Sequence, residues 1–391
     1  MAEKIKVLML LDNEFPADNR VEKMILSMQE TNISVDLLNC TKVGKPNFEV
    51  YKGFNIYRWN LSKILFKFGA ASIITPFYFN RWKKEVDILF SKNKYDVIHI
   101  NDLPLVSVGY YAKQKYGCKL VSDQHEFYSN WINRTSHYNK GLGKIIKALS
   151  NWPKYEKKYL NLSDLVVTVS TNLHDIYLKR LGLDANNIII VPNTPDKSIL
   201  TANAKNDDLE KYKDDFIIFY GGGIDILRGI DIAIKAMPKI LESIPNAKMI
   251  LAGPVYKGYN PFDTINRLNL EKKVIHVGVL PQLILADYIS RADICYHIPP
   301  ADNEEANNSI ATKIYQYGAQ SKPIIVSDAK MMHDFVIDNK LGLAIYNNNS
   351  EQFADNAIRI YNKDFEFNNE GKSYFWEDTV KPILEWYAKL S

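Results

Sequence analysis

Short apolar segments alternate with amphipathic stretches along this chain, and the alternation occurs twice. Short apolar runs predict buried strands, whereas apolar residues three or four positions apart predict helices. The first set of strands is predicted at 6–11, 34–39, 97–100, 119–122, 165–169 and 188–191. The second set is predicted at 216–221, 248–252, 274–277, 294–297, 323–326 and 344–346.

Helical patterns separate these strands. They cover 20–30, 62–91, 105–115, 143–160, 172–181, 230–243, 262–268, 283–290, 309–316, 331–337 and 351–361. Strands joined through helices form parallel sheets that are covered on both faces. The pattern therefore predicts an α/β protein with two Rossmann-like domains, whose ligands bind at the carboxyl ends of the strands.

The domain boundary is expected in a polar, turn-rich segment at 195–215. A chain of 391 residues exceeds what one core usually supports, which also favours two domains. We predict a first domain over residues 1–200 and a second over 201–372. An aromatic, amphipathic helix follows within 373–391, and we expect it to pack back on the first domain.

The composition excludes several classes of protein. No run of 18 apolar residues is present, so no transmembrane helix is expected. The segment MAEKIKVLMLLD has no cleavage site of a signal peptide and is predicted to be the first strand. Cys40, Cys118 and Cys295 are widely spaced beside strands, which predicts reduced core residues and a cytoplasmic protein.

The net charge of +4 is unevenly distributed. Residues 1–200 contain 28 Lys+Arg and 19 Asp+Glu, whereas residues 201–391 contain 21 and 26. This asymmetry favours an anionic partner for the first domain, either a membrane surface or a phosphorylated acceptor. The alternative is a solvated, lysine-rich face. Nucleic acid is not expected, because zinc-ligand spacing, RNP-like motifs and basic tails are missing.

Two stretches of the first domain, 60–84 and 131–158, mix aromatic residues with lysines. They predict a peripheral membrane contact with Trp82 and Trp152 at the lipid interface, which would suit a lipid-linked acceptor. The alternative is that residues 64–79 belong to the core and that the lysines are solvated.

The segment 216–234, FIIFYGGGIDILRGIDIAI, carries the strongest local signal. A strand ends in three glycines, and Arg228 and Gly229 then open a helix-like run. Glycines let backbone N–H groups approach a ligand closely, and a helix start has positive polarity. Arg228 adds a planar, charged donor. The pattern predicts a diphosphate site, although it lacks both GxGxxG and the GKS/T of a Walker loop. The alternative is a plain strand-to-helix turn.

Several motifs resemble those of the family 4 retaining glycosyltransferases, which have the GT-B fold. They follow one another in the family's order and include YDVIHINDLP (95–104), KLVSDQHEFY (119–128), residues 220–229, KMILAGP (248–254), VIHVGVLP (274–281) and ATKIYQYGAQSKPIIVSD (311–328). The resemblance implies two Rossmann-like domains with parallel sheets facing across a cleft. It also implies transfer of a sugar from a nucleotide diphosphate sugar to a glycan or lipid-linked acceptor, in bacterial surface-polysaccharide biosynthesis.

The resemblance further implies roles for individual residues of the donor site. His125, Arg228 and Lys313 would be catalytic, with His125 orienting the donor sugar and the two cations stabilising the leaving diphosphate. A solvent-exposed helix lysine is the alternative for Lys313. The implied donor-binding residues are Gly222, Gly223, Arg228, Asn308, Lys313 and Gln316.

Two departures from the family pattern concern the donor site. Gly223 stands where the family places an arginine. Asn308 and Gln316 stand at the two positions of its Glu-x7-Glu motif. The Gln316 amide accepts hydrogen bonds at one atom only, so ribose binding would be weaker or altered in preference. Glu304 and Glu305 are nearby substitutes, with a solvated loop as the alternative.

Asp102, Glu126 and Arg20 are the implied acceptor-binding residues, and an N-cap is the alternative role of Asp102. No metal and no cofactor are expected besides the nucleotide sugar substrate. The other readings are a non-catalytic subunit that binds sugar nucleotides and a sugar-nucleotide epimerase. A lipid-linked acceptor would place this cytoplasmic protein at the inner face of the cell membrane.

Overall fold

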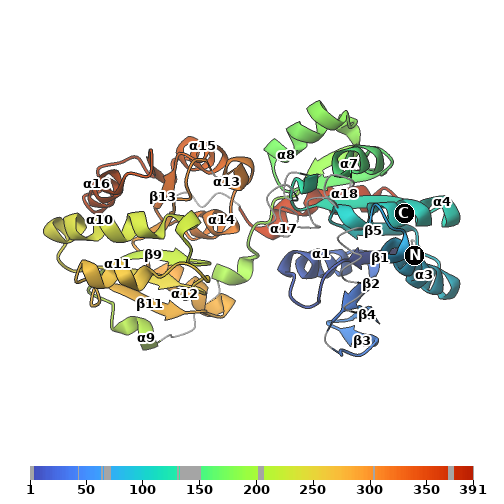
Figure 1. Cartoon of the computed structure of the whole chain (residues 1–391), viewed down its shortest axis with the longest axis horizontal. Coiled ribbons are helices and arrows are strands. Elements are labelled where there is room, and N and C mark those ends of the chain that lie inside the picture. Colours follow the sequence, from blue (N-terminus) through green and yellow to red (C-terminus); the bar gives the residue numbers. More distant parts are fainter. Residues whose placement is uncertain are drawn as a thin grey trace. The chain divides into compact units, whose positions relative to one another are not determined.

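The computed structural model describes residues 4–42, 44–62, 65, 72–129, 132, 151–200, 207–302, 304–368 and 374–390. The chain forms two compact α/β units (Figure 1). The first unit comprises Met1–Pro192 together with Val380–Ser391, and the second comprises Asn193–Thr379. The passage from the first unit to the second thus follows Pro192 rather than residue 200. The end of the chain returns to the first unit.

The first unit contains an eight-stranded sheet with the order β3-β4-β2-β1-β5-β6-β7-β8. All pairings are parallel except that of β3 with β4. The strands are β1 (Ile5–Leu11), β2 (Ile33–Thr41), β3 (Phe48–Tyr51), β4 (Phe54–Asn60), β5 (Val97–Asn101), β6 (Lys119–Gln124), β7 (Leu165–Thr168) and β8 (Ile188–Ile190).

The helices of the first unit include one from the end of the chain. They are α1 (Asn19–Gln29), η1 (Leu103–Leu105), α3 (Phe77–Lys92), α4 (Val106–Tyr116), α7 (Trp152–Leu160), α8 (Thr171–Ile176), the π-helix η3 (Tyr177–Leu181), η4 (Ala185–Asn187) and α18 (Lys381–Ala388). Asp18 caps α1 by accepting from the N–H groups of Arg20 and Val21. Gly117, with φ 72°, ends α4 in the left-handed conformation.

The second unit contains a six-stranded parallel sheet with the order β11-β10-β9-β12-β13-β14. Its strands are β9 (Phe216–Gly221), β10 (Ala247–Ala252), β11 (Val274–Gly278), β12 (Ile294–His297), β13 (Ile324–Ser327) and β14 (Gly342–Ile345). Its helices are η5 (Lys197–Leu200), α9 (Asp207–Glu210), η6 (Ile226–Arg228), α10 (Ile230–Ser243), α11 (Pro261–Arg267), α12 (Gln282–Arg291), α13 (Glu304–Asn308), α14 (Thr312–Ala319), α15 (Lys330–Asp338), α16 (Ser350–Tyr361) and α17 (Trp376–Thr379).

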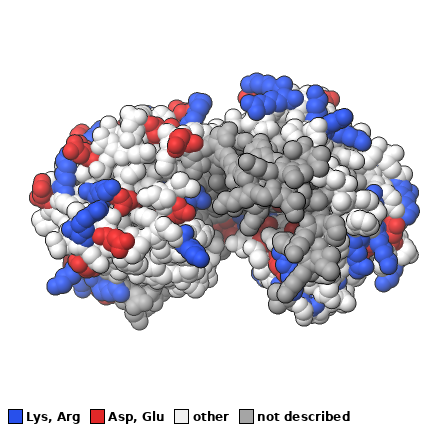
Figure 2. Space-filling view, viewed as in Figure 1, with Lys and Arg blue, Asp and Glu red and all other residues white. Residues whose placement is uncertain are grey.

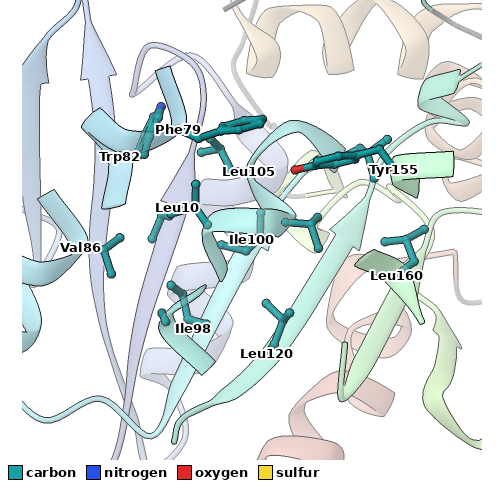
Figure 3. Close-up of a cluster of buried hydrophobic side chains, with 14 of the residues drawn as sticks. Leu10, Phe79, Trp82, Val86, Ile98, Ile100, Leu105, Leu120, Tyr155 and Leu160 are labelled. Atoms are coloured by element: carbon teal, nitrogen blue, oxygen red, sulfur yellow. The ribbon is translucent and has the colours of Figure 1, made fainter. Parts of the chain in front are cut away.

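The first core lies between the sheet and the helices α3, α4 and α7 (Figure 3). Trp82 and Val86 of α3 pack beside Leu10 and Ile98 of the central strands. Trp82 is fully buried and Trp152 is 2% exposed. The prediction that these tryptophans lie at a membrane interface is therefore wrong. Their rings instead fill the core, where each large ring removes much apolar area from water.

The three cysteines are buried and free, as the sequence predicts for core residues. None of the described helices has the length and apolar character needed to cross a membrane. The predicted helix 62–91 is interrupted: Leu65 is helical, residues 72–76 form turns, and α3 begins at Phe77, while residues 63, 64 and 66–71 lie outside the described part. Residues 143–150 of the predicted helix 143–160 lie outside it too.

Three further features differ from the sequence expectations. The sequence pattern did not predict the hairpin of β3 and β4, which adds two strands to the edge of the first sheet. The short helices α9 and α13 were also not predicted. The single helix expected within 373–391 is divided into α17 and α18, because Pro382 is compatible with a helix start and not with its interior.

Candidate active site

The second sheet reverses its direction of growth at β9. From β9 the chain builds β10 and β11 on one side, then crosses over to build β12, β13 and β14 on the other. The loops after β9 and β12 therefore leave in opposite directions, and such a point is where open α/β sheets bind ligands. The glycine run Gly221–Gly223 ends β9, and His297 ends β12 at the same edge.

Gly222 and Gly253 allow two close approaches at this edge. Gly222 has φ 146°, and a Cβ there would lie 2.3 Å from Nζ of Lys313. Gly253 has φ 137°, and its Cβ would lie 1.9 Å from the carbonyl oxygen of Gly222. A side chain at either position would collide with its neighbour and strain the backbone. The two glycines thus let the loops and the lysine come together.

Gly223 is required for a different reason. Its φ lies outside the left-handed region, but a Cβ would lie 2.3 Å from Cε2 of Tyr256. The Tyr256 ring therefore occupies the space next to the position at which the family resemblance places an arginine. Tyr220 donates from its hydroxyl to the Gly223 carbonyl at 2.9 Å. Within the described residues the Gly223 N–H has no hydrogen-bond acceptor, so it is available to a ligand.

Lys313 lies in the first turn of α14, and its ammonium group reaches back to β9. Nζ donates to the Tyr220 hydroxyl at 2.9 Å and lies 4.1 Å from the centre of that ring. Burial, together with the charge of Arg228, lowers the pKa of Lys313 to about 7. The alternative of a solvated helix lysine is wrong, because the side chain is held against Tyr220 at the carboxyl end of β9.

Arg228 is placed by a short turn after the glycines. Asp225 begins this turn by accepting from the N–H of Leu227 at 2.7 Å, and Gly229 ends it with φ 72°. Arg228 is half-buried, and no ion pair joins it to a described acidic side chain. Its charge also acts on His297, whose pKa is held well below its ordinary value by burial and by the cations Lys313 and Arg228.

The structure thus brings Gly222, Gly223, Arg228 and Lys313 together at one strand end. Two cations share this edge, and in the described surroundings neither has an ion pair with a carboxylate. A neutral His297 adds no positive charge to the pair. The combination of the Gly223 N–H with these cations, close to the start of α10, is suited to bind a diphosphate.

The remaining predicted donor residues are half-buried. Asn308 ends α13, and Gln316 lies one turn after Lys313 on α14, hence on the same helix face. Their contacts with a ribose stay a prediction. The side chains of Glu304 and Glu305, the possible substitutes, lie outside what the structure describes.

The first sheet has its own point of reversal, between β1 and β5. Asp102 directly follows β5 with φ 64° and ψ 160°, a region that essentially only glycine occupies. Its N–H donates to the carbonyl of Asp123 at 2.9 Å. Its side chain makes no capping hydrogen bond, so the N-cap alternative is wrong. In this strained backbone conformation the Asp102 side chain lies beside His125 instead.

His125 lies between two carboxylates. Its Nδ1 is 3.4 Å from Oδ1 of Asp102, and its Nε2 is 3.5 Å from Oδ2 of Asp123. Burial lowers the pKa of His125, but the two carboxylates outweigh it and raise the pKa to about 9. His125 is therefore an imidazolium at neutral pH, with a carboxylate near each ring nitrogen.

Arg20 is buried and forms a two-pronged ion pair with Asp123. Nη2 donates to Oδ1 at 2.8 Å and Nε to Oδ2 at 3.2 Å, while Nη1 donates to the carbonyl of Val191 at 2.9 Å. Burial would raise the pKa of Asp123, but Arg20 above all holds it well below the ordinary range. With a 4% exposed side chain, Arg20 is better placed to hold Asp123 than to contact an acceptor.

Sequence reasoning missed two partners of this cluster. His99 of β5 lies 3.9 Å from Asp123 through Nε2, and its Nδ1 is 2.8 Å from the hydroxyl of Tyr387 in α18. The end of the chain thus contributes to the polar network of the first unit. Glu126 follows His125 and is half-buried, so its role toward an acceptor stays a prediction.

No group of three His, Cys, Asp or Glu side chains in the described part of the chain is arranged to hold a metal ion.

Comparison with known proteins decides the family. Residues 19–198 match the model of Glycosyltransferase Family 4, and residues 202–374 match the model of Glycosyl transferases group 1. The chain belongs to glycosyltransferase family 4. The transferase is 25% identical over 358 residues to an uncharacterized glycosyltransferase of Methanocaldococcus jannaschii, covering 88% of this chain and 86% of that protein.

Solved structures share the GT-B fold with this glycosyltransferase. Sucrose-phosphate synthase from Thermosynechococcus elongatus superposes with a TM-score of 0.70 at 17% identity, over 99% of this chain and 96% of that chain. The Anabaena protein HepE, in complex with UDP and glucose, gives a TM-score of 0.67 at 15% identity, over 98% and 100%. The family match to both halves makes the protein a glycosyltransferase.

Proposed function

We propose that this glycosyltransferase takes its sugar from a nucleoside diphosphate sugar bound at the carboxyl end of β9. The single observation that carries the proposal is the pair Arg228 and Lys313, two cations beside the unpaired N–H of Gly223. HepE binds UDP in a GT-B fold, and this supports a nucleotide as the ligand.

The proposed catalysis is mainly charge stabilisation. When the bond between the anomeric carbon and the diphosphate oxygen breaks, that oxygen gains negative charge. Arg228 and Lys313 would stabilise this charge more strongly than the charge of the intact donor, and this difference lowers the barrier. Both groups are already placed by η6 and α14, so little reorganisation is needed as the bond breaks.

His125 has a positioning role in this proposal. Each ring nitrogen of His125 already has a carboxylate neighbour, Asp102 at Nδ1 and Asp123 at Nε2, so its positive charge and ring edge are what it offers a substrate. It would orient the donor sugar, while the first unit binds the acceptor. We propose retention at the anomeric carbon and a glycan or lipid-linked acceptor of bacterial surface-polysaccharide biosynthesis. The family resemblance supports both.

The surface charge of the first unit supports an anionic acceptor or membrane. Basic side chains gather over α7 and over η3, the turn of helix that follows α8, on the face that Figure 2 shows. The exposed ones on α7 and η3 are Lys154, Lys157, Lys158, Lys179 and Arg180. Sedimentation with anionic vesicles at low salt tests the membrane part, because binding through these lysines should weaken as salt rises.

Donor hydrolysis tests the proposed activity without knowledge of the acceptor. Purified protein is incubated with UDP-, GDP- and ADP-sugars, and release of the nucleoside diphosphate is followed by chromatography. We expect slow hydrolysis of one donor, with loss of the activity in Arg228→Ala. Absence of both hydrolysis and nucleotide binding for every donor would refute the proposal.

A further inference from the structure

Tyr256 is an exposed aromatic residue at the edge where the cations lie. It follows β10, the strand next to β9, and its side chain is 51% exposed. The loop is nevertheless held in place, because Ile224 and Val255 form a parallel bridge beyond the two strands. Ile224 N–H donates to Pro254 at 2.8 Å, and Tyr256 N–H donates to Ile224 at 3.0 Å. A fixed backbone thus presents a large ring to solvent.

The position of the ring depends on Gly223. Around a Cβ built at Gly223, the nearest atoms are Cε2, Cζ and the hydroxyl oxygen of Tyr256, at 2.3, 3.0 and 3.1 Å. The side of the ring that carries the hydroxyl therefore lies against the glycine. Any larger residue at 223 would have to displace it.

The hydroxyl of Tyr256 lies beside Gly223, at the strand end whose donor groups have no anionic partner among the described residues. The Gly223 N–H beside it has no acceptor among the described residues, and Arg228 and Lys313 have no carboxylate partner there. Tyr220 has a similar hydroxyl, but it is already engaged by Lys313 and by the Gly223 carbonyl. Within the same part of the chain, Tyr256 makes no hydrogen bond through its own hydroxyl.

We propose that Tyr256 is a further donor-binding residue, whose hydroxyl donates a hydrogen bond to the diphosphate held by Gly223, Arg228 and Lys313. This inference rests on the proposed function. It names a residue that the sequence motifs did not indicate. It also gives Gly223 a role, since the glycine makes room for the ring that carries the hydroxyl.

Two substitutions should each remove the proposed hydrogen bond between the Tyr256 hydroxyl and the diphosphate, by different means. Tyr256→Phe deletes the hydroxyl and keeps the ring. Gly223→Ala keeps the hydroxyl and displaces the ring, and alanine is compatible with the backbone because φ at 223 is not left-handed. In a Tyr256→Ala background the ring is gone, so Gly223→Ala should have no further effect. Gly223→Ala and Tyr256→Ala therefore form a double-mutant cycle. We expect the loss of binding energy in the double variant to be smaller than the sum of the losses in the two single variants.

The experiment is calorimetric titration of the full chain with UDP, GDP and ADP, followed by the cycle with the nucleotide that binds most tightly. We expect Tyr256→Phe and Gly223→Ala each to weaken binding about tenfold, the value of one hydrogen bond to a charged group. Tyr361→Phe is the matched control, because this 47% exposed tyrosine packs on Phe216 at the other end of β9 and should bind like wild type.

The outcomes separate this inference from the proposed function. If wild type binds none of the nucleotides, the proposed function itself fails. If wild type binds and Tyr256→Phe binds equally well, only the role of the Tyr256 hydroxyl is refuted. Additive effects of Gly223→Ala and Tyr256→Ala would also refute it. Circular dichroism of each variant confirms that a loss of binding does not arise from unfolding.

Discussion

Lys313 makes the affinity for the nucleotide depend on pH. Its pKa of about 7 reflects burial and the neighbouring Arg228, so near neutral pH the free protein carries Lys313 partly uncharged. A bound diphosphate supplies the missing negative charge and should raise this pKa. Because the charged form then binds better, binding takes up a proton when the solution pH lies between the pKa of Lys313 in the free protein and its higher pKa in the complex.

The magnitude follows from the protonated fraction. With a pKa of about 7, roughly half of the Lys313 side chains are charged at about pH 7 and roughly 3% at about pH 8.5. If only the charged form binds the diphosphate well, affinity falls about fifteenfold between these two conditions. The groups that face Lys313 do not titrate in this window. The pKa of Tyr220 is raised above its ordinary value, and the pKa of His297 is held well below its ordinary value.

The assay is titration calorimetry with the best-binding nucleoside diphosphate in buffers of different ionisation enthalpy. At about pH 8 the wild type should take up about one proton per nucleotide bound. Lys313→Arg keeps a permanent charge and should lose both the proton uptake and most of the pH dependence. The same fall in affinity in Lys313→Arg, or binding to wild type without proton uptake, would refute this account of Lys313.

Substitutions at three further positions test other parts of the account. Arg228→Ala should lower kcat/KM for the donor about a hundredfold in steady-state assays, because it removes a positive charge that stabilises the leaving diphosphate. Arg228→Lys keeps the charge and should have a smaller effect. Urea denaturation should show Asp102→Gly to be more stable than Asp102→Asn by about 1 kcal/mol, since glycine relieves the strained backbone, while transfer falls in both. Arg20→Met removes the two-pronged partner of the buried Asp123, leaves His125 as its charged neighbour, and should cost about 3 kcal/mol in the same assay; unchanged stability would show that the Arg20 pair is not needed.

The arrangement of the strands is largely readable from the sequence, because it rests on local patterns. Each apolar run of the second domain coincides with a strand, and the glycines after β9 lie where the pattern places a ligand. The hairpin of β3 and β4 was missed because β3 is short and lies at the edge, with Phe48 and Val50 exposed. Its composition therefore lacks the signal of a buried strand.

Burial of individual side chains could not be read in the same way. A mixture of tryptophans and lysines is compatible both with a lipid interface and with a core bordered by solvated charges. Trp82 and Trp152 belong to the core because α3 and α7 cover the sheet, and this depends on distant residues. Lys313 was ambiguous for the same reason, since its partner Tyr220 is 93 positions away.

The network around His125 was predicted only in part. His125 and Asp102 were indicated by their places after strands, but the opposing effects of Asp123 and Arg20 require the three-dimensional arrangement. Tyr387 and Tyr256 carried no sequence signal, because an aromatic residue in a helix or after a strand usually belongs to packing. Only the contacts with His99 and Gly223 distinguish them.

The central claim is that a nucleoside diphosphate binds at the carboxyl end of β9. A crystal structure of the protein with the tightest-binding nucleoside diphosphate tests it most directly. We predict that the phosphates contact the N–H of Gly223 and the side chains of Arg228 and Lys313. Phosphates bound elsewhere, for example after β1 in the first unit, would contradict the account.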